Sequence, residues 1–246
     1  MRICVINPNT SSAMTDIIAT AARSVARPDC EIVAVTSSMG PASIESHYDE
    51  ALAVPGLLRA IAENPDCDGY LIACFGDPGL DAAREVAAAP VLGIAEAAMH
   101  LAGPLGRSFS VVTTLHRTIG RATDLVDHNG FAGRCAGIHA CDIPVLELET
   151  NPATAEILEK ACREALHTDG SDAIVLGCAG MADLAHRIGD EIGAPVVDGV
   201  AAGVGMLTSM AAMGLRTGTA SGEFRPPPAK EYSGILRDFG IGRPGS

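Results

Sequence analysis

One block of sequence occurs twice in this chain, and the repetition limits the possible folds more than any other feature. An apolar run that begins with aspartate ends at Cys74, and a second such run ends at Cys178. A glycine-containing turn, a helical pattern and a Pro-Val pair follow each cysteine, and the two cysteines lie 104 residues apart. The starts of the two halves match as well, because the runs at 3–6 and 109–112 both lead into polar loops. This self-similarity indicates two copies of one structural unit.

Short apolar runs alternate with helical patterns along both halves, an order typical of βαβ units and parallel sheets. We expect an α/β fold with two pseudo-symmetric lobes, residues 1–103 and 104–214, and a tail, 215–246, that packs back on the first lobe. The expected strands lie at 3–6, 32–35, 70–73, 91–94, 109–112, 173–176 and 195–197. The expected helices lie near 13–26, 48–63, 79–88, 116–129, 152–168, 180–192 and 200–213.

Both cysteines of the repeat follow predicted strands, at the carboxyl ends where open parallel sheets bind ligands. If the lobes face each other about a pseudo-twofold axis, Cys74 and Cys178 meet across one cleft. Lobes packed back to back would instead keep the two thiols apart. The repeat by itself leaves both arrangements open.

Each of these thiols is expected near unpaired backbone N–H groups at the start of a helix, which would lower its pKa. A lone cysteine at such a place is more often a packing residue, but two in equivalent positions favour catalysis. Inversion of a carbon centre needs a base on one face and an acid on the other. Cys74 and Cys178 are therefore the candidate catalytic pair, with one as thiolate and one as thiol.

Removal of a proton next to a carbonyl also requires donors that stabilise the enolate. The polar loops offer Asn9, Thr10, Thr113 and Thr114, and backbone N–H groups after each cysteine add to them. The loop that holds Asn9 also reads as a turn and helix cap. Other candidates on the same rim are Phe75 as a pocket wall, Asp77 as the nearest carboxylate, and Glu45 or Tyr48 as substrate contacts, with Ser46 equally explained as a cap.

The composition excludes several classes of function. A formal net charge of −13 argues against nucleic-acid and anionic-membrane binding. No apolar stretch reaches the roughly 18 residues of a membrane span. The seven histidines show no metal-ligand spacing, and no phosphate-binding glycine motif is present, so we expect neither metal nor cofactor. The eight cysteines form no CxxC pair and no signal peptide is visible, which predicts a cytoplasmic protein.

Three blocks, Ile6–Ser11, Ala73–Leu80 and Leu176–Met181, resemble the hydantoin and allantoin racemases of the aspartate/glutamate racemase superfamily. The resemblance spans nearly the whole chain and implies two flavodoxin-like lobes, cofactor-independent racemisation of a small molecule in the cleft between them, and a homo-oligomer. The family's catalytic cysteines correspond to Cys74 and Cys178. Its ligand-contacting loops correspond to Asn9, Gly76, Thr113, Thr114, Ala179 and Gly180.

The residues after the cysteines depart from one branch of the superfamily. Amino-acid racemases tend to carry Asn-Thr after the first cysteine and Thr with a polar residue after the second. Here Phe75-Gly76 and Ala179-Gly180 stand there, which favours a 5-substituted hydantoin, or allantoin, over a free amino acid. The alternatives are an amino-acid racemase, a maleate isomerase, an arylmalonate decarboxylase, which needs only one cysteine, and a two-lobed binding protein without catalysis.

Overall fold

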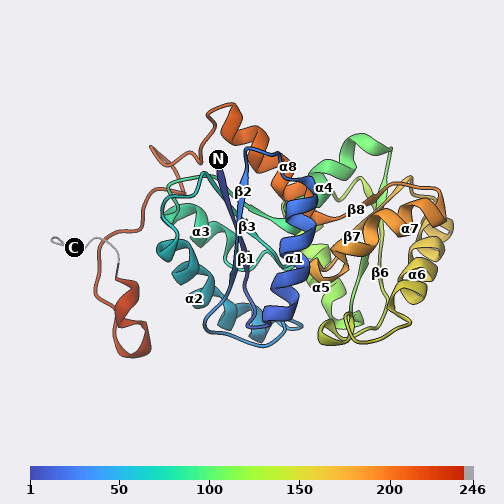
Figure 1. Cartoon of the computed structure of the whole chain (residues 1–246), viewed down its shortest axis with the longest axis horizontal. Coiled ribbons are helices and arrows are strands. Elements are labelled where there is room, and N and C mark those ends of the chain that lie inside the picture. Colours follow the sequence, from blue (N-terminus) through green and yellow to red (C-terminus); the bar gives the residue numbers. More distant parts are fainter. Residues whose placement is uncertain (241–246) are drawn as a thin grey trace.

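The computed structural model describes residues 1–240 as two four-stranded sheets with all strand pairs parallel. The strand orders are β2-β1-β3-β4 and β6-β5-β7-β8, so each strand of one sheet has a counterpart in the other. Figure 1 shows the two sheets side by side. This repetition confirms the predicted fold class of two similar α/β lobes. The strands are β1 (Arg2–Asn7), β2 (Glu31–Thr36), β3 (Gly69–Ile72), β4 (Val91–Gly93), β5 (Phe109–Thr113), β6 (Cys135–Ala140), β7 (Ala173–Gly177) and β8 (Val196–Val197).

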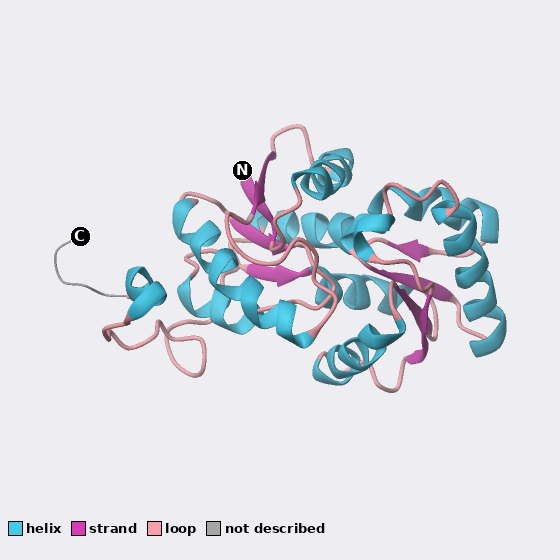
Figure 2. Ribbon diagram, turned by 90° about the horizontal axis from the view of Figure 1, so that it is seen from below, coloured by secondary structure: helices cyan, strands magenta, loops and turns pink. Residues whose placement is uncertain are grey.

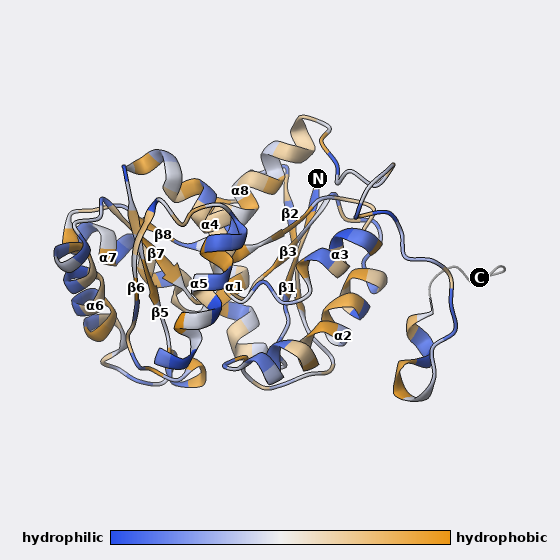
Figure 3. Cartoon of the chain, turned by 180° about the vertical axis from the view of Figure 1, so that it is seen from behind, coloured by the Kyte–Doolittle hydropathy of each residue, from blue (hydrophilic) through white to orange (hydrophobic). Residues whose placement is uncertain are grey.

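Helices cover both faces of each sheet, as the view from below shows (Figure 2). Central strands of such sheets are shielded on both sides, so they are apolar throughout rather than alternating. Ile3 to Ile6 of β1 are fully buried, and the strands are among the most hydrophobic segments in Figure 3. The α-helices are α1 (Ser12–Val25), α2 (His47–Glu63), α3 (Leu80–Val86), α4 (Ile94–Ala102), α5 (Ile119–His128), α6 (Thr154–Asp169), α7 (Ala185–Ile192) and α8 (Gly199–Ala212).

Helices α4 and α8 join the two lobes into one body. Helix α4 packs against β7 of the second sheet, whereas α8 packs against β3 of the first. At Gly203 of α8, a Cβ atom would lie 2.3 Å from the Leu71 side chain, so the helix approaches the sheet closely. One continuous apolar core therefore includes residues of both sheets, such as Val5 and Val175.

The tail after α8 runs beside the outer face of the first lobe (Figure 1). The Arg84 guanidinium lies 5.7 Å from the centroid of the Phe224 ring, and the Arg59 guanidinium lies 5.2 Å from that of Phe239. The end of the tail, residues 241–246, lies outside the described residues. Across residues 1–240, no helix is both long enough and apolar enough to cross a membrane.

Candidate active site

A cavity of about 190 Å³ opens at the carboxyl ends of the central strands, with walls from both lobes. Cys74 after β3 and Cys178 after β7 both line it, so the lobes face each other rather than packing back to back. Binding sites for drug-sized ligands start at roughly 300 Å³, so this one suits a smaller molecule. The other lining residues are Asn9, Met14, Ile44, Glu45, Ser46, His47, Glu50, Ala73, Phe75, Gly76, Thr113, Thr114, Arg117, Thr118, Arg121, Ala122, Val145, Gly177 and Ala179.

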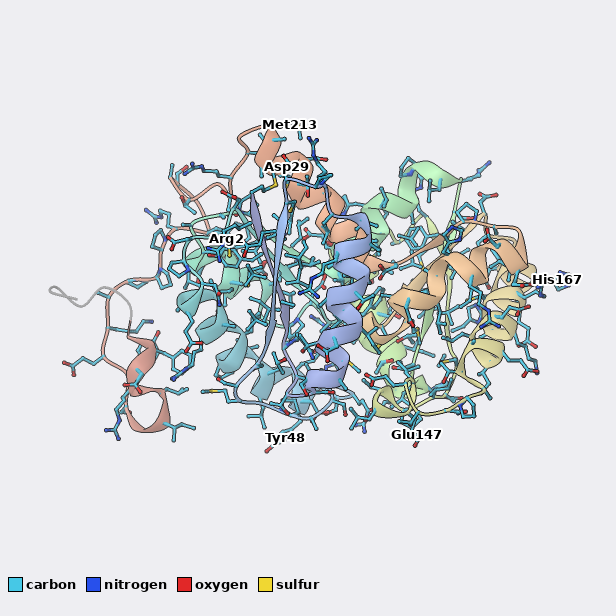
Figure 4. The ribbon with its side chains drawn as sticks, viewed as in Figure 1. Arg2, Asp29, Tyr48, Glu147, His167 and Met213 are labelled. Atoms are coloured by element: carbon cyan, nitrogen blue, oxygen red, sulfur yellow. The ribbon has the colours of Figure 1, made fainter. Side chains whose placement is uncertain are left out.

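Loops from both lobes form the rim of this cavity. Tyr48 and Glu147 are labelled along the lower edge of the molecule in Figure 4, and each lies near a lining residue in sequence, His47 and Val145 respectively. Tyr48 is 74% exposed and does not line the cavity. Ser46 accepts a hydrogen bond from the Asp49 N–H and caps α2, which is the capping role that the sequence indicated for it.

The two thiols have matching backbone surroundings. The N–H of Gly76 donates to Cys74, and the N–H of Gly180 donates to Cys178. Burial nevertheless raises the pKa of Cys178 to about 12 and the pKa of Cys74 still further, and the nearby Cys178 adds to the shift at Cys74. The predicted net lowering of the thiol pKa is therefore wrong, because desolvation outweighs the favourable backbone N–H groups.

Asn9 is held with its amide nitrogen available to the cavity. Its side-chain oxygen accepts hydrogen bonds from Asn7 Nδ2 at 2.8 Å and from the Ser11 N–H at 2.9 Å. Its Nδ2 has Met14 Sδ, 3.3 Å away, as a weak acceptor. The Asn9 amide can therefore donate to a substrate carbonyl without losing a strong hydrogen bond.

The loop after β5 adds hydroxyl groups from the second lobe. Thr113 Oγ1 lies 3.0 Å from Thr118 Oγ1 and 3.4 Å from the Gly177 carbonyl, so its position is fixed by the protein. Thr114 also lines the cavity, and its hydroxyl has no hydrogen-bond partner among residues 1–240. Thr114 is therefore the better placed of the two to bind a ligand.

Besides Tyr48, three of the predicted site residues do not line the cavity. Thr10 is exposed and donates to the Pro41 carbonyl. Asp77 turns away and accepts hydrogen bonds from backbone N–H groups at the start of α4. Gly180 lies next to Cys178, and its backbone N–H donates to that thiol.

The structure adds charged residues that the sequence did not single out. Arg121 of α5 lies 3.4 Å from Glu50 of α2, and both line the cavity together with Arg117. Glu45 forms a second contact between the two lobes, because its Oε1 accepts a hydrogen bond from the Val145 N–H at 2.7 Å. Arg117 and Arg121 lie in a polar helical stretch, and no motif marks either residue as part of a site.

The model of the Asp/Glu/hydantoin racemase family matches residues 3–207, which is most of the chain. The chain belongs to this family. A hydantoin racemase of Pseudomonas sp. (strain NS671) is 47% identical to it over 243 residues, covering 98% of this chain and 97% of that protein. As a member of this family with relatives so similar, the protein is an isomerase of the racemase type.

Solved structures of other proteins share the two-lobed fold. An allantoin racemase from Klebsiella pneumoniae superposes with a TM-score of 0.94 and 50% identity, covering 98% of this chain and 99% of that one. An arylmalonate decarboxylase superposes with a TM-score of 0.64 at 16% identity, over 91% of this chain and 97% of that one. The second likeness shows a shared fold alone.

Proposed function

We propose that this racemase inverts C5 of 5-monosubstituted hydantoins, allantoin among them, with Cys74 and Cys178 as its acid–base pair. The observation that carries the proposal is that two thiols from equivalent strand ends line one small cavity. The names of the relatives, hydantoin racemase and allantoin racemase, support the choice of ring. The small volume of the cavity suits a single ring with a short substituent.

The C5 proton of a hydantoin is acidic because C5 lies between a carbonyl and a nitrogen. One thiolate takes this proton, and the electron pair of the C–H bond moves onto the C4 carbonyl to form an enolate. The opposite thiol then donates its proton to C5 from the other face. Turnover exchanges the two protonation states, so the enzyme is left ready for the enantiomer it has just made.

The developing enolate needs donors on the carbonyl oxygen, which are worth about 2.7–4 kcal/mol each in comparable sites. The amide of Asn9 and the hydroxyl of Thr114 are available for this from opposite lobes. Backbone N–H groups at Gly76 and Gly180 stabilise whichever cysteine is ionised. No step in this scheme requires a cofactor.

The proposal is tested by racemisation in deuterium oxide. One enantiomer of a 5-substituted hydantoin, and separately of allantoin, should lose optical rotation while the product gains deuterium at C5. Cys74→Ala and Cys178→Ala should each lower racemisation by about 10²–10⁴-fold, whereas Cys30→Ala, which is remote from the cavity, should retain it. Preserved chirality across this panel, or decarboxylation of an arylmalonate without racemisation, contradicts the proposal.

The raised thiol pKa values predict how the rate depends on pH. Burial raises the pKa of Cys178 to about 12, so only a small fraction of the enzyme carries a thiolate at neutral pH. We expect kcat/KM to rise by up to about tenfold per pH unit between about pH 6 and pH 9. Polarimetry with the uncatalysed rate subtracted measures this, and a flat profile would contradict the raised pKa of the thiol that acts as the base.

A further inference from the structure

A bridge between the lobes ends beside Cys74. Arg121, on α5 of the second lobe, donates its Nε and Nη2 hydrogens to the Gly76 carbonyl of the first lobe, at 3.0 and 2.6 Å. The same Nε lies 3.4 Å from a carboxylate oxygen of Glu50, on α2. The Arg121 side chain is 32% exposed and that of Glu50 is 18% exposed, so the pair is largely shielded from water.

Gly76 is held from three sides by these contacts. Its carbonyl accepts both hydrogen bonds from Arg121, and a Cβ atom at this position would lie 2.4 Å from Glu50 Oε1, so Glu50 packs directly on its Cα. Its N–H donates to Cys74. The Gly76 carbonyl belongs to the peptide unit after Gly76 and the Gly76 N–H to the unit before it, so Arg121 holds the first unit directly and the second only through the Gly76 Cα between them.

We propose that Arg121 is a positioning residue, which acts through Gly76 to hold the N–H donor that stabilises the Cys74 thiolate. The proposal rests on the two-thiol function above and deepens it. Arg121 does not exchange a proton with substrate; it determines how readily the thiolate of Cys74 forms.

The second thiol lacks an equivalent bridge. The Gly180 N–H donates to Cys178, but among residues 1–240 no arginine side chain donates to the Gly180 carbonyl. The side-chain atoms around Gly180 belong to Leu148, Met14 and Cys178 itself. Loss of Arg121 should therefore affect Cys74 and leave Cys178 unchanged.

The charged groups around Cys74 support the same role for Arg121. Burial is the main cause of the raised pKa of Cys74, and Cys178 from the opposite lobe, Glu50 from α2 and Asp77 from its own loop raise it further. Burial raises the pKa of Glu50, and the charges of Arg121 from α5 and of His47, 3.9 Å away, partly offset this rise. The positive charge of Arg121 thus offsets one of the carboxylates that raise the pKa of Cys74, in addition to holding the Gly76 carbonyl.

The rate at which each thiol is alkylated tests the positioning role of Arg121 without any substrate. Arg121→Gln should slow iodoacetamide labelling of Cys74 by about tenfold at a given pH, the effect of about one pKa unit, and leave labelling of Cys178 unchanged, with each peptide quantified by mass spectrometry. Arg121→Lys keeps a charge beside Glu50 but loses the two-pronged bond, so it should restore part of the rate. Arg163→Gln is the matched control, because Arg163 also contacts one carboxylate and one carbonyl but lies away from the cavity. Equal slowing of both thiols, or none at Cys74, overturns the proposal.

Deuterium exchange by single-cysteine variants supplies a second readout. With Cys178→Ala, Cys74 alone should exchange the C5 hydrogen of one enantiomer with retention, and Arg121→Gln should slow that exchange by about tenfold. With Cys74→Ala, Arg121→Gln should leave exchange of the other enantiomer unchanged. Absence of racemisation by the wild-type protein contradicts the proposed function, and the alkylation experiment still decides the role of Arg121.

Discussion

Among individual residues, Asp77 has a structural role beside the cavity that depends on its protonation state. Its carboxylate is buried and accepts hydrogen bonds from the N–H groups of Ala95 and Glu96 at 3.0 and 2.9 Å. Burial raises its pKa to about 7, although both hydrogen bonds partly offset the shift. Asp77 thus connects the Cys74 loop to the start of α4 and, through that helix, to the core.

This shift makes stability depend on pH in a defined direction. The pKa of Asp77 is about 7 in the folded protein, whereas its ordinary value is 3.8. Asp77 therefore contributes most to the free energy of unfolding below about pH 4, and this contribution is lost as the pH rises through about 7. Asp77→Asn stays neutral and tolerates the positive φ of 44° at this position. We expect the variant to flatten the loss of unfolding free energy between about pH 4 and pH 7, measured by urea unfolding at each pH. An unchanged slope in the variant would assign the dependence to another group.

At the scale of elements, the sequence predicted the buried strands well and missed two elements. Strand β6 (Cys135–Ala140) is a partly exposed edge strand that contains Gly137 and His139, so it forms no apolar run. Helix α4 (Ile94–Ala102) is buried around most of its surface, and its only polar residues are Glu96 and His100, which are too few to mark an amphipathic helix in the sequence. In both cases neighbouring elements, rather than local periodicity, determine the structure.

The packing of α8 on the first sheet can be tested with two glycines of that helix. A methyl group at Gly203 would collide with Leu71, whereas nothing lies within 4 Å of a methyl group at Gly205. Gly203→Ala should lower the free energy of unfolding by about 1–3 kcal/mol through overpacking. Gly205→Ala should be neutral or stabilise by up to about 1 kcal/mol through helix propensity. Chemical unfolding of both variants measures this, and equal effects would mean that α8 does not approach β3 so closely.

At the scale of the whole molecule, the cavity exists only while the lobes face each other. Besides the shared core, a hydrogen bond from the Val145 N–H to Glu45 and the Arg121 bridge to Gly76 cross between the lobes at the cavity. Glu45 also raises the pKa of Cys178. Its carboxylate therefore has two separable effects, one as a hydrogen-bond acceptor and one as a charge.

Two substitutions at Glu45 separate these effects. Glu45→Ala leaves the Val145 N–H without its acceptor and should lower kcat/KM by about tenfold or more, the cost of a hydrogen bond to a charged group. Glu45→Gln keeps an acceptor oxygen and removes the charge, so it should retain most activity and shift the alkaline rise of kcat/KM to lower pH. Steady-state kinetics across pH distinguish them, and equal losses in both variants would show that the charge matters rather than the bond.

The amino-acid sequence alone was enough to predict the two α/β lobes, the family, and the two strand ends at which Cys74 and Cys178 lie. These features are visible in the sequence because they are local or repeated. A buried parallel strand appears as a run of apolar residues, and a duplication appears as self-similarity between two segments. Only the tertiary structure brought the two thiols to one cavity, raised their pKa values and placed Arg121 against Gly76. Desolvation and contacts between lobes depend on groups far apart along the chain, and their proximity is a property of the packed molecule.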